Sequence, residues 1–486
     1  MKPIEIAAFA SLVFATIASS QPSLTIYNAD FAVVRDRVAL DLKKGENAVT
    51  YAGATQYLEP DSVVLRDPGK KTDLRILEQS YRAEVLSQGL LLSQNEGKEL
   101  DFINRSKDEQ ESVIRGKVIR SGYTSGASDD ARSSGSPIIE VGGKLQFSLP
   151  GEPRFPTMGN DTVLTPTLSW QLASDRAAKL DAELSYITGG MSWSAAYNLI
   201  SPEKGDTLDI VGWVTIDNHS GTAFENASLK LMAGDVNKVQ AAGGPPRAVA
   251  MKTGGMPFGD EAVVTEKAFD EFHLYQLPRA TTLRNGETKQ VEFLRATGVK
   301  APTLYIYDGA NIPWQYLHDT EVRDDRYSNI QLNSKVWVMR EFKNTEENDL
   351  GLPLPKGRAR FYRQDDADGR PEFTGENSID HTPQGETVRI RTGDAFDIVG
   401  SRTRSDFSLS NKKDQAEEAF EIKLRNRKKE AVEVRVAERL YRGVNWEIIQ
   451  KSDEYVKVDS RNIEFRVTLK PDEEKVVTYR VRYNWK

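Results

Sequence analysis

Residues 207–221 read TLDIVGWVTIDNHSG, and this stretch decides the fold. Leu208, Ile210, Val214 and Ile216 recur with a period of two, which places alternate side chains on opposite faces of a strand. Asn218 then begins a run of Asn, His, Ser and Gly, residues that favour turns. The stretch is therefore predicted to be a strand with one buried face, ended by a turn.

The same alternation returns in the C-terminal part of the chain. Apolar residues occupy every second position at residues 420–424, 432–436 and 477–483, with polar loops between these runs. Short alternating strands with few helical patterns between them favour antiparallel sheets packed face to face. The predicted fold class is mainly β, with several antiparallel sandwiches, an immunoglobulin-like sandwich at the C-terminus and a small barrel-like insertion.

Loop-like compositions divide the chain into predicted domains. Polar or glycine-rich stretches at 121–136, 241–260 and 310–332 have few apolar side chains to bury. The predicted parts are a leader at 1–20, an N-terminal β region at 21–104, the insertion at 105–160, a central sandwich at 161–310 and the C-terminal sandwich at 333–486.

The first twenty residues are typical of a bacterial secretory signal. Lys2 precedes an apolar run, and Ala18, Ser19 and Ser20 provide small residues for cleavage after Ser20. The chain has no cysteine, which excludes disulfides and thiolate chemistry and suits a large exported bacterial protein. We expect a periplasmic or extracellular protein, and no other apolar run reaches the ~20 residues of a membrane span.

Charge and motifs exclude several classes of function. The net charge of −7 offers no basic excess for binding nucleic acid. The chain contains no Walker loop, dinucleotide-binding glycine motif, zinc-protease helix motif or nucleophile elbow. We therefore expect no cofactor.

One acidic segment is a candidate catalytic site. Asp380, His381, Glu386 and Asp394 lie within fifteen residues of one another, and carboxylates beside a histidine can act as acid and base or bind a metal. The alternative is a turn. The side chains of Asp380 and Thr382 can accept or donate hydrogen bonds to nearby backbone groups, Pro383 restricts its backbone dihedral angles and Gly385 permits angles that other residues avoid.

Two further patterns have a functional and a structural interpretation. Asp366 and Asp368 lie in a DDADG string that resembles part of a calcium loop, although a hairpin tip explains the same residues. The rings of Tyr186, Trp193, Tyr197 and Trp213 suit a sugar-binding platform, but large rings in alternating strands more often pack in the core.

Several longer strings resemble a family of exported bacterial proteins, domain of unknown function 4139, which also forms the C-terminal part of mucoidy inhibitor proteins. These strings are YITGGMSW at 186–193, GWVTIDN at 212–218, GLPLPKG at 351–357, GDAFD at 393–397 and EIKLRN at 421–426. The resemblance extends toward the N-terminus as far as residue 26. It implies no catalytic residues. A long coiled-coil insertion of the mucoidy inhibitors is absent, and only residues 84–92 suggest a short helix.

Two functions remain open from the sequence. The first is a scaffold or binding protein of the bacterial envelope, whose loops and strand edges contact an envelope protein or a surface glycan. The second is a metal-dependent or acid/base hydrolase that uses Asp380, His381 and Asp394.

Overall fold

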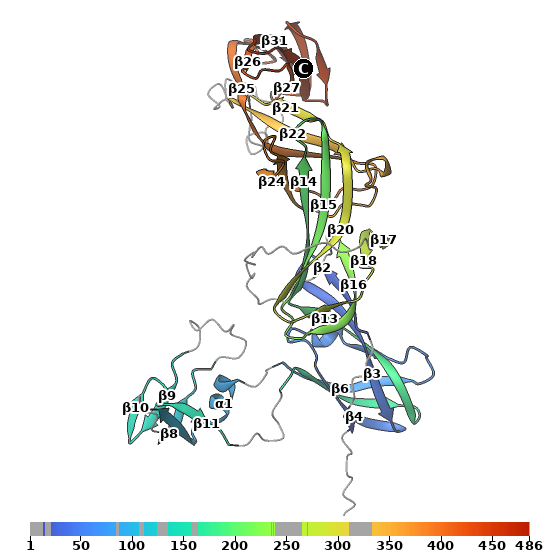
Figure 1. Cartoon of the computed structure of the whole chain (residues 1–486), viewed down its shortest axis with the longest axis vertical. Helices are drawn as coiled ribbons and strands as arrows, with labels where there is room; N and C mark the ends of the chain where they lie inside the picture. Colours follow the sequence, from blue (N-terminus) through green and yellow to red (C-terminus); the bar gives the residue numbers. More distant parts are fainter. Residues whose placement is uncertain are drawn as a thin grey trace, which may run out of the picture. The chain divides into compact units, whose positions relative to one another are not determined.

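The protein is described by a computed structural model. It covers residues 13–14, 21–83, 87–105, 111–123, 135–156, 164–234, 236, 238, 265–269, 271–310 and 333–485. Strands account for 64% of these residues and helix for 3%, which confirms the mainly β prediction (Figure 1). Most of the predicted leader and of the three predicted loops lies outside the described residues.

The chain divides into two compact units. Unit 1 comprises residues 1–193 and 216–289, and unit 2 comprises residues 194–215 and 290–486. The chain passes from one unit to the other inside three strands, β14 (Met191–Ser201), β15 (Thr207–Asn218) and β20 (Glu287–Lys300).

Unit 1 contains two sheets besides the sheet of the insertion. The four-stranded sheet has the order β1-β4-β12-β6, and its strands are Val13–Phe14, Gly45–Ala52, Thr167–Ser174 and Leu74–Arg82. The larger sheet has the order β17-β18-β16-β2-β3-β13-β5, with β19 paired to β16. Its strands are Thr265–Phe269, Phe272–Gln276, Phe224–Ala233, Ser23–Tyr27, Phe31–Leu42, Ala178–Gly189, Val64–Arg66 and, for β19, Thr281–Leu283. A 3-10 turn, η1, spans Pro60–Ser62.

The insertion is a third sheet with its own small core. Its order is β10-β9-β8-β7-β11, with strands Lys144–Gln146, Ile138–Val141, Glu111–Arg120, Glu99–Arg105 and Glu152–Arg154. Helix α1 (Gln88–Gln94) begins at the N-cap Ser87 and contributes Leu92 to a core with Phe102 and Ile139 (Figure 1). The described strands form an open sheet rather than a closed barrel, because β10 and β11 are its two unpaired edges.

A five-stranded sheet follows the order β20-β15-β14-β23-β24. Its last two strands are Gly357–Gln364 and Pro371–Ile379. The parallel pairing of β14 with β23 brings Ala195 opposite Gly357, although about 160 residues separate them in sequence.

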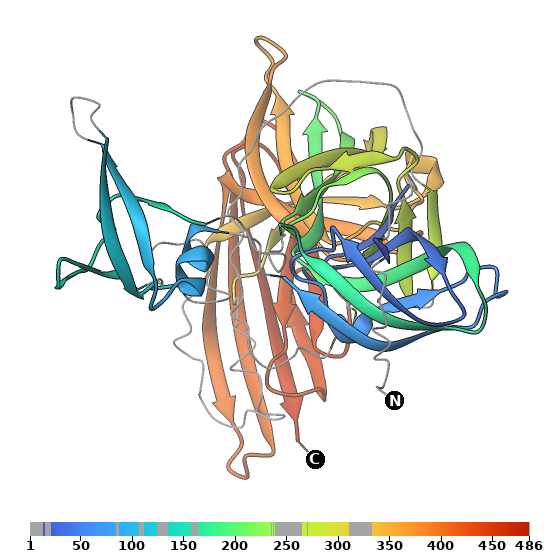
Figure 2. The same ribbon diagram turned by 90° about the horizontal axis from the view of Figure 1, so that it is seen from below.

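Unit 2 also contains a nine-stranded sheet, whose C-terminal strands are drawn in red in Figure 2. Its order is β28-β31-β26-β25-β22-β21-β27-β30-β29. The strands in that order are Trp446–Lys451, Glu474–Asn484, Gln415–Asn426, Thr387–Leu409, Lys335–Lys343, Thr303–Tyr307, Val432–Arg439, Asn462–Leu469 and Tyr455–Lys457. A 3-10 turn, η3, spans Glu346–Asn348.

The nine-stranded sheet folds over its own core. Phe465 on β30 and Tyr479 on β31 come from near opposite ends of the strand order, yet their ring centroids lie 5.6 Å apart. The alternating apolar side chains of residues 420–424 and 432–436 point into this core, where all of them are buried. The arrangement is sandwich-like, as the sequence predicted.

The same asparagine-anchored corner occurs three times in the described part of the chain. Asn218, Asn344 and Asn426 are each 0% exposed and lie at or just after the end of a strand. Each Nδ2 donates to three backbone carbonyl oxygens, two of them in the turn that precedes another strand, and each Oδ1 accepts a backbone N–H. These amides satisfy buried backbone groups that no strand ladder reaches.

No helix among the described residues is long and apolar enough to cross a membrane.

Candidate functional site

A cleft of about 790 Å³ lies within unit 2. Its lining comes from the turn between β14 and β15 and from β21, β22, β23, β24 and β27. Thr392 and residues 395–397 of β25 and residues 428, 430 and 431 of the loop before β27 complete it. This volume falls in the range of ~300–1,000 Å³ typical of ligand sites. The cleft is therefore large enough for a small molecule or for several units of a polymer.

Phe396 is the most unusual residue of the cleft. It is 95% exposed, although Ala395 and Ile398 on the same strand pack in the core. The cause is a bulge: Trp337 pairs with Asp394 and Lys335 pairs with Val399, so residues 395–398 of β25 oppose a single residue of β22. Bulges of this kind re-aim side chains and are common beside functional sites.

Other aromatic rings and charged groups line the same cleft. Tyr305, Phe361 and Tyr362 contribute rings, and Lys428 Nζ donates to the Tyr305 hydroxyl at 2.7 Å. Burial opposes the charge of Lys428, but its bonds to Tyr305 and Glu430 raise its pKa above the ordinary value. Lys428 thus stays cationic at the cleft wall.

Two arginines have limited exposure in the lining. Arg340 donates from Nη1 to the Ala301 carbonyl oxygen at 2.8 Å and lies 3.6 Å from Asp206. Burial lowers the pKa of Arg340, and the Asp206 carboxylate partly offsets this. Arg435 Nε is buried without a hydrogen bond in the described part of the chain and lies 3.9 Å from Glu433 and 4.0 Å from Glu464.

The charges of the lining balance. The basic members are Lys204, Arg340, Arg363, Lys428 and Arg435, and the acidic members are Glu203, Asp206, Asp397, Glu430 and Glu433. Donors and acceptors are thus both available, with no excess of either sign. The cleft can hold a polar ligand by hydrogen bonds while an aromatic ring covers its apolar surface.

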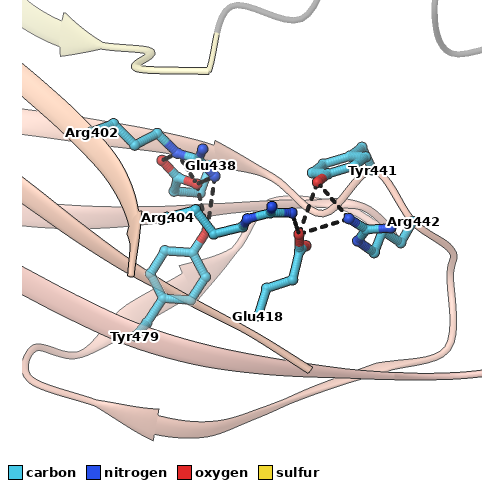
Figure 3. A network of polar contacts seen from close by, with 7 residues as sticks. All are labelled: Arg402, Arg404, Glu418, Glu438, Tyr441, Arg442 and Tyr479. Carbon is cyan, nitrogen blue, oxygen red and sulfur yellow. Dashed lines mark hydrogen bonds and ion pairs between the residues drawn. The ribbon is translucent and has the colours of Figure 1, made fainter. Parts of the chain in front are cut away.

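A second polar cluster is sealed inside the nine-stranded sheet (Figure 3). Arg402 donates to Glu438 from Nε at 2.9 Å and from Nη2 at 2.8 Å. Tyr479 also donates to Glu438, and burial raises the pKa of its phenol well above the ordinary value.

Glu418 is the centre of the other half of this cluster. Its Oε1 accepts from Arg442 Nη2 at 2.9 Å, from the Tyr441 hydroxyl at 3.0 Å and from Arg404 Nη1 at 3.2 Å (Figure 3). The side chains of Glu418 and Arg442 are both 0% exposed. None of the residues drawn in Figure 3 lines the cleft, so we interpret the cluster as structural.

The comparison with protein families decides the family. The family described as "Domain of unknown function (DUF4139)" matches residues 182–486, which is more than half of the chain. The chain belongs to this family. The cleft and the buried cluster both lie inside the matched domain of unknown function 4139, whereas the insertion lies outside it. A search of curated proteins finds no match.

Three of the sequence-predicted catalytic residues lie on one exposed turn of this domain. His381 Nδ1 accepts the backbone N–H of Lys356 at 3.2 Å, and the Asp380 carbonyl oxygen accepts from the Thr382 hydroxyl at 2.9 Å. The backbone N–H of Glu386 donates to Pro383, and Asn344 holds the same turn through its amide. Each of these contacts fixes the backbone of a corner.

Asp394 is engaged elsewhere. Its carboxylate pairs with Arg391 and with Lys335, the latter at 3.1 Å, and these bonds lower its pKa despite partial burial. Asp394 is thus held as a carboxylate on β25 by two cations. It neighbours the cleft through Ala395 and Phe396.

The metal candidates lie at a hairpin tip between β23 and β24. The Asp368 carboxylate accepts the backbone N–H of Arg370 at 2.9 Å, and Asp366 lies in the same turn. The backbone N–H of Gly369 donates to the Asp365 carbonyl oxygen and closes this turn. Among the residues that the structure describes, no group of three or more acidic or imidazole side chains could hold a metal ion. The described geometry offers no observation in favour of hydrolysis.

The buried cluster is not among the sites predicted from the sequence, although the sequence carries a signal for it. Glu418 precedes Phe420 by two positions and Glu438 follows Val436 by two, so both carboxylates fall on the inward face of a predicted strand. A charge in register with the core face indicates a buried ion pair, because an unpaired charge there is too costly.

Proposed function

We propose that the protein is exported to a bacterial envelope and acts there as a non-catalytic binding or scaffold protein. In this proposal its partner, an envelope protein or a surface glycan, sits in the cleft of unit 2. The observation that carries the proposal is Phe396, an almost fully exposed ring placed by a bulge at the wall of a polar cleft.

Energetics support a binding role for this ring. Exposed aromatic side chains gain free energy when a partner covers them, and aromatic residues concentrate at recognition sites. Ala395 and Ile398 anchor the bulge in the core of unit 2, so Phe396 is presented from a strand rather than a loop. The layout of residues 1–20 supports export.

Photo-cross-linking in living cells tests this proposal. Replacing Phe396 with p-benzoylphenylalanine keeps an aromatic ring at the cleft and should yield a discrete covalent adduct in the envelope fraction. The matched control is the same replacement at Phe147, which is 68% exposed on the insertion. Adducts at 147 but not at 396, or a protein retained in the cytoplasm, would contradict the proposal.

A further inference from the structure

We propose that the cleft of unit 2 binds a neutral oligosaccharide. This inference rests on the proposed binding function and deepens it by naming the class of ligand. Three features of the cleft carry it: the exposed ring, the balance of charge and the position of its strands within the sheets.

The exposed ring of Phe396 suits a sugar. A pyranose presents a flat patch of C–H groups on one face, and this patch loses its contact with water when it lies on an aromatic ring. At 95% exposure nearly the whole of the Phe396 side chain is open to such contact. Alanine at this position would remove the platform without disturbing the core.

The charges that line the cleft suit sugar hydroxyl groups, which carry no net charge. Each sugar hydroxyl both donates and accepts, so it pairs well with a carboxylate and a guanidinium placed side by side. Arg435 and Glu433 both line the cleft and provide such a pair, with Arg435 Nε and Glu433 Oε1 3.9 Å apart. Five basic and five acidic residues line the cleft, so an anionic polymer gains no overall attraction.

The positions of the strands disfavour an extended peptide. Peptides commonly bind by adding a strand to a free sheet edge. The cleft strands β21, β22, β23 and β27 each have a partner on both sides, so their backbone groups are already paired. Only Thr374 of the lining belongs to a sheet-edge strand, β24. Over most of the cleft, recognition therefore relies on side chains, as sugar recognition does.

The test uses the purified full-length chain on an array of immobilised oligosaccharides. The probes are neutral glucose, mannose, galactose and N-acetylglucosamine oligomers together with oligomers of uronic acids. We expect binding to at least one neutral series. Calorimetry on that oligosaccharide should show about tenfold weaker binding for Phe396→Ala and about fivefold weaker binding for Arg435→Gln.

Phe147→Ala is the matched control, since it removes an exposed ring outside the cleft. It should change the affinity less than about twofold, and all three variants should melt near the wild-type temperature. Absence of neutral-sugar binding, a preference for uronic acids, or affinity that the two cleft variants leave unchanged would overturn the inference. If the photo-cross-link at position 396 instead captures a protein, the binding function stands and the sugar assignment fails.

Discussion

Glu418→Ala is expected to lower the free energy of unfolding of unit 2 by roughly 3–5 kcal/mol. The substitution removes the carboxylate that accepts from Arg442, Arg404 and Tyr441. The Arg442 side chain is 0% exposed, so its charge would stay buried without the carboxylate that neutralises it. Urea denaturation followed by tryptophan fluorescence measures the loss.

Glu421→Ala is the matched control on the same strand. The Glu421 side chain is 39% exposed and pairs only with Lys423 at 3.0 Å. Exposed pairs of this kind contribute about 0–1 kcal/mol, so the control should unfold close to wild type. Equal losses for both variants would show that the buried cluster does not stabilise the sheet as described.

Asn426→Asp is the second large effect, at roughly 3 kcal/mol. The two side chains have nearly the same shape, but the substitution replaces an NH₂ donor with an acceptor. Asn426 Nδ2 donates to the carbonyl oxygens of Glu430 at 2.8 Å and Lys470 at 3.0 Å. The carboxyl oxygen of the variant would face these oxygens in a fully buried site, where repulsion and lost hydrogen bonds add.

The pH dependence of Asn426→Asp provides an internal check. A carboxyl group facing carbonyl oxygens has a raised pKa in the folded state, so its destabilisation should be least in acid and should grow as the pH rises through that pKa. Asn377→Asp changes an exposed position on β24. It should neither lower the free energy of unfolding nor make that free energy fall as the pH rises. A variant at position 426 as stable as the one at 377 would contradict the role of the corner.

The alternation of the sequence predicted the strands because local side-chain burial has the period of the strand itself. Residues 207–218 form β15 as predicted. Tyr186, Trp193 and Tyr197 are buried, which confirms their interpretation as packing residues, whereas Trp213 is half-buried. The pairing of strands was not predictable in the same way. The parallel partners β14 and β23 lie about 160 residues apart, and a local pattern does not specify which distant strands meet.

The cleft could not be predicted from the sequence for the same reason. Its lining comes from segments between residues 201 and 435 that meet only when two sheets form. Phe396 lies two residues after Asp394, the last of the predicted catalytic residues, and its sequence neighbours alone do not indicate an exposed ring. The bulge that exposes its ring follows from the register of β22 against β25, and a local pattern does not reveal register.

Hydrogen–deuterium exchange of the protein with and without its partner from the native envelope tests directly whether the cleft is the binding site. We expect new protection in the segments that line the cleft, residues 303–305, 338–340, 395–397 and 432–435. Peptides of the insertion and of the turn at 380–386 should exchange as before. Protection confined to that turn, with the cleft segments unchanged, would show that the protein does not bind its partner in the cleft.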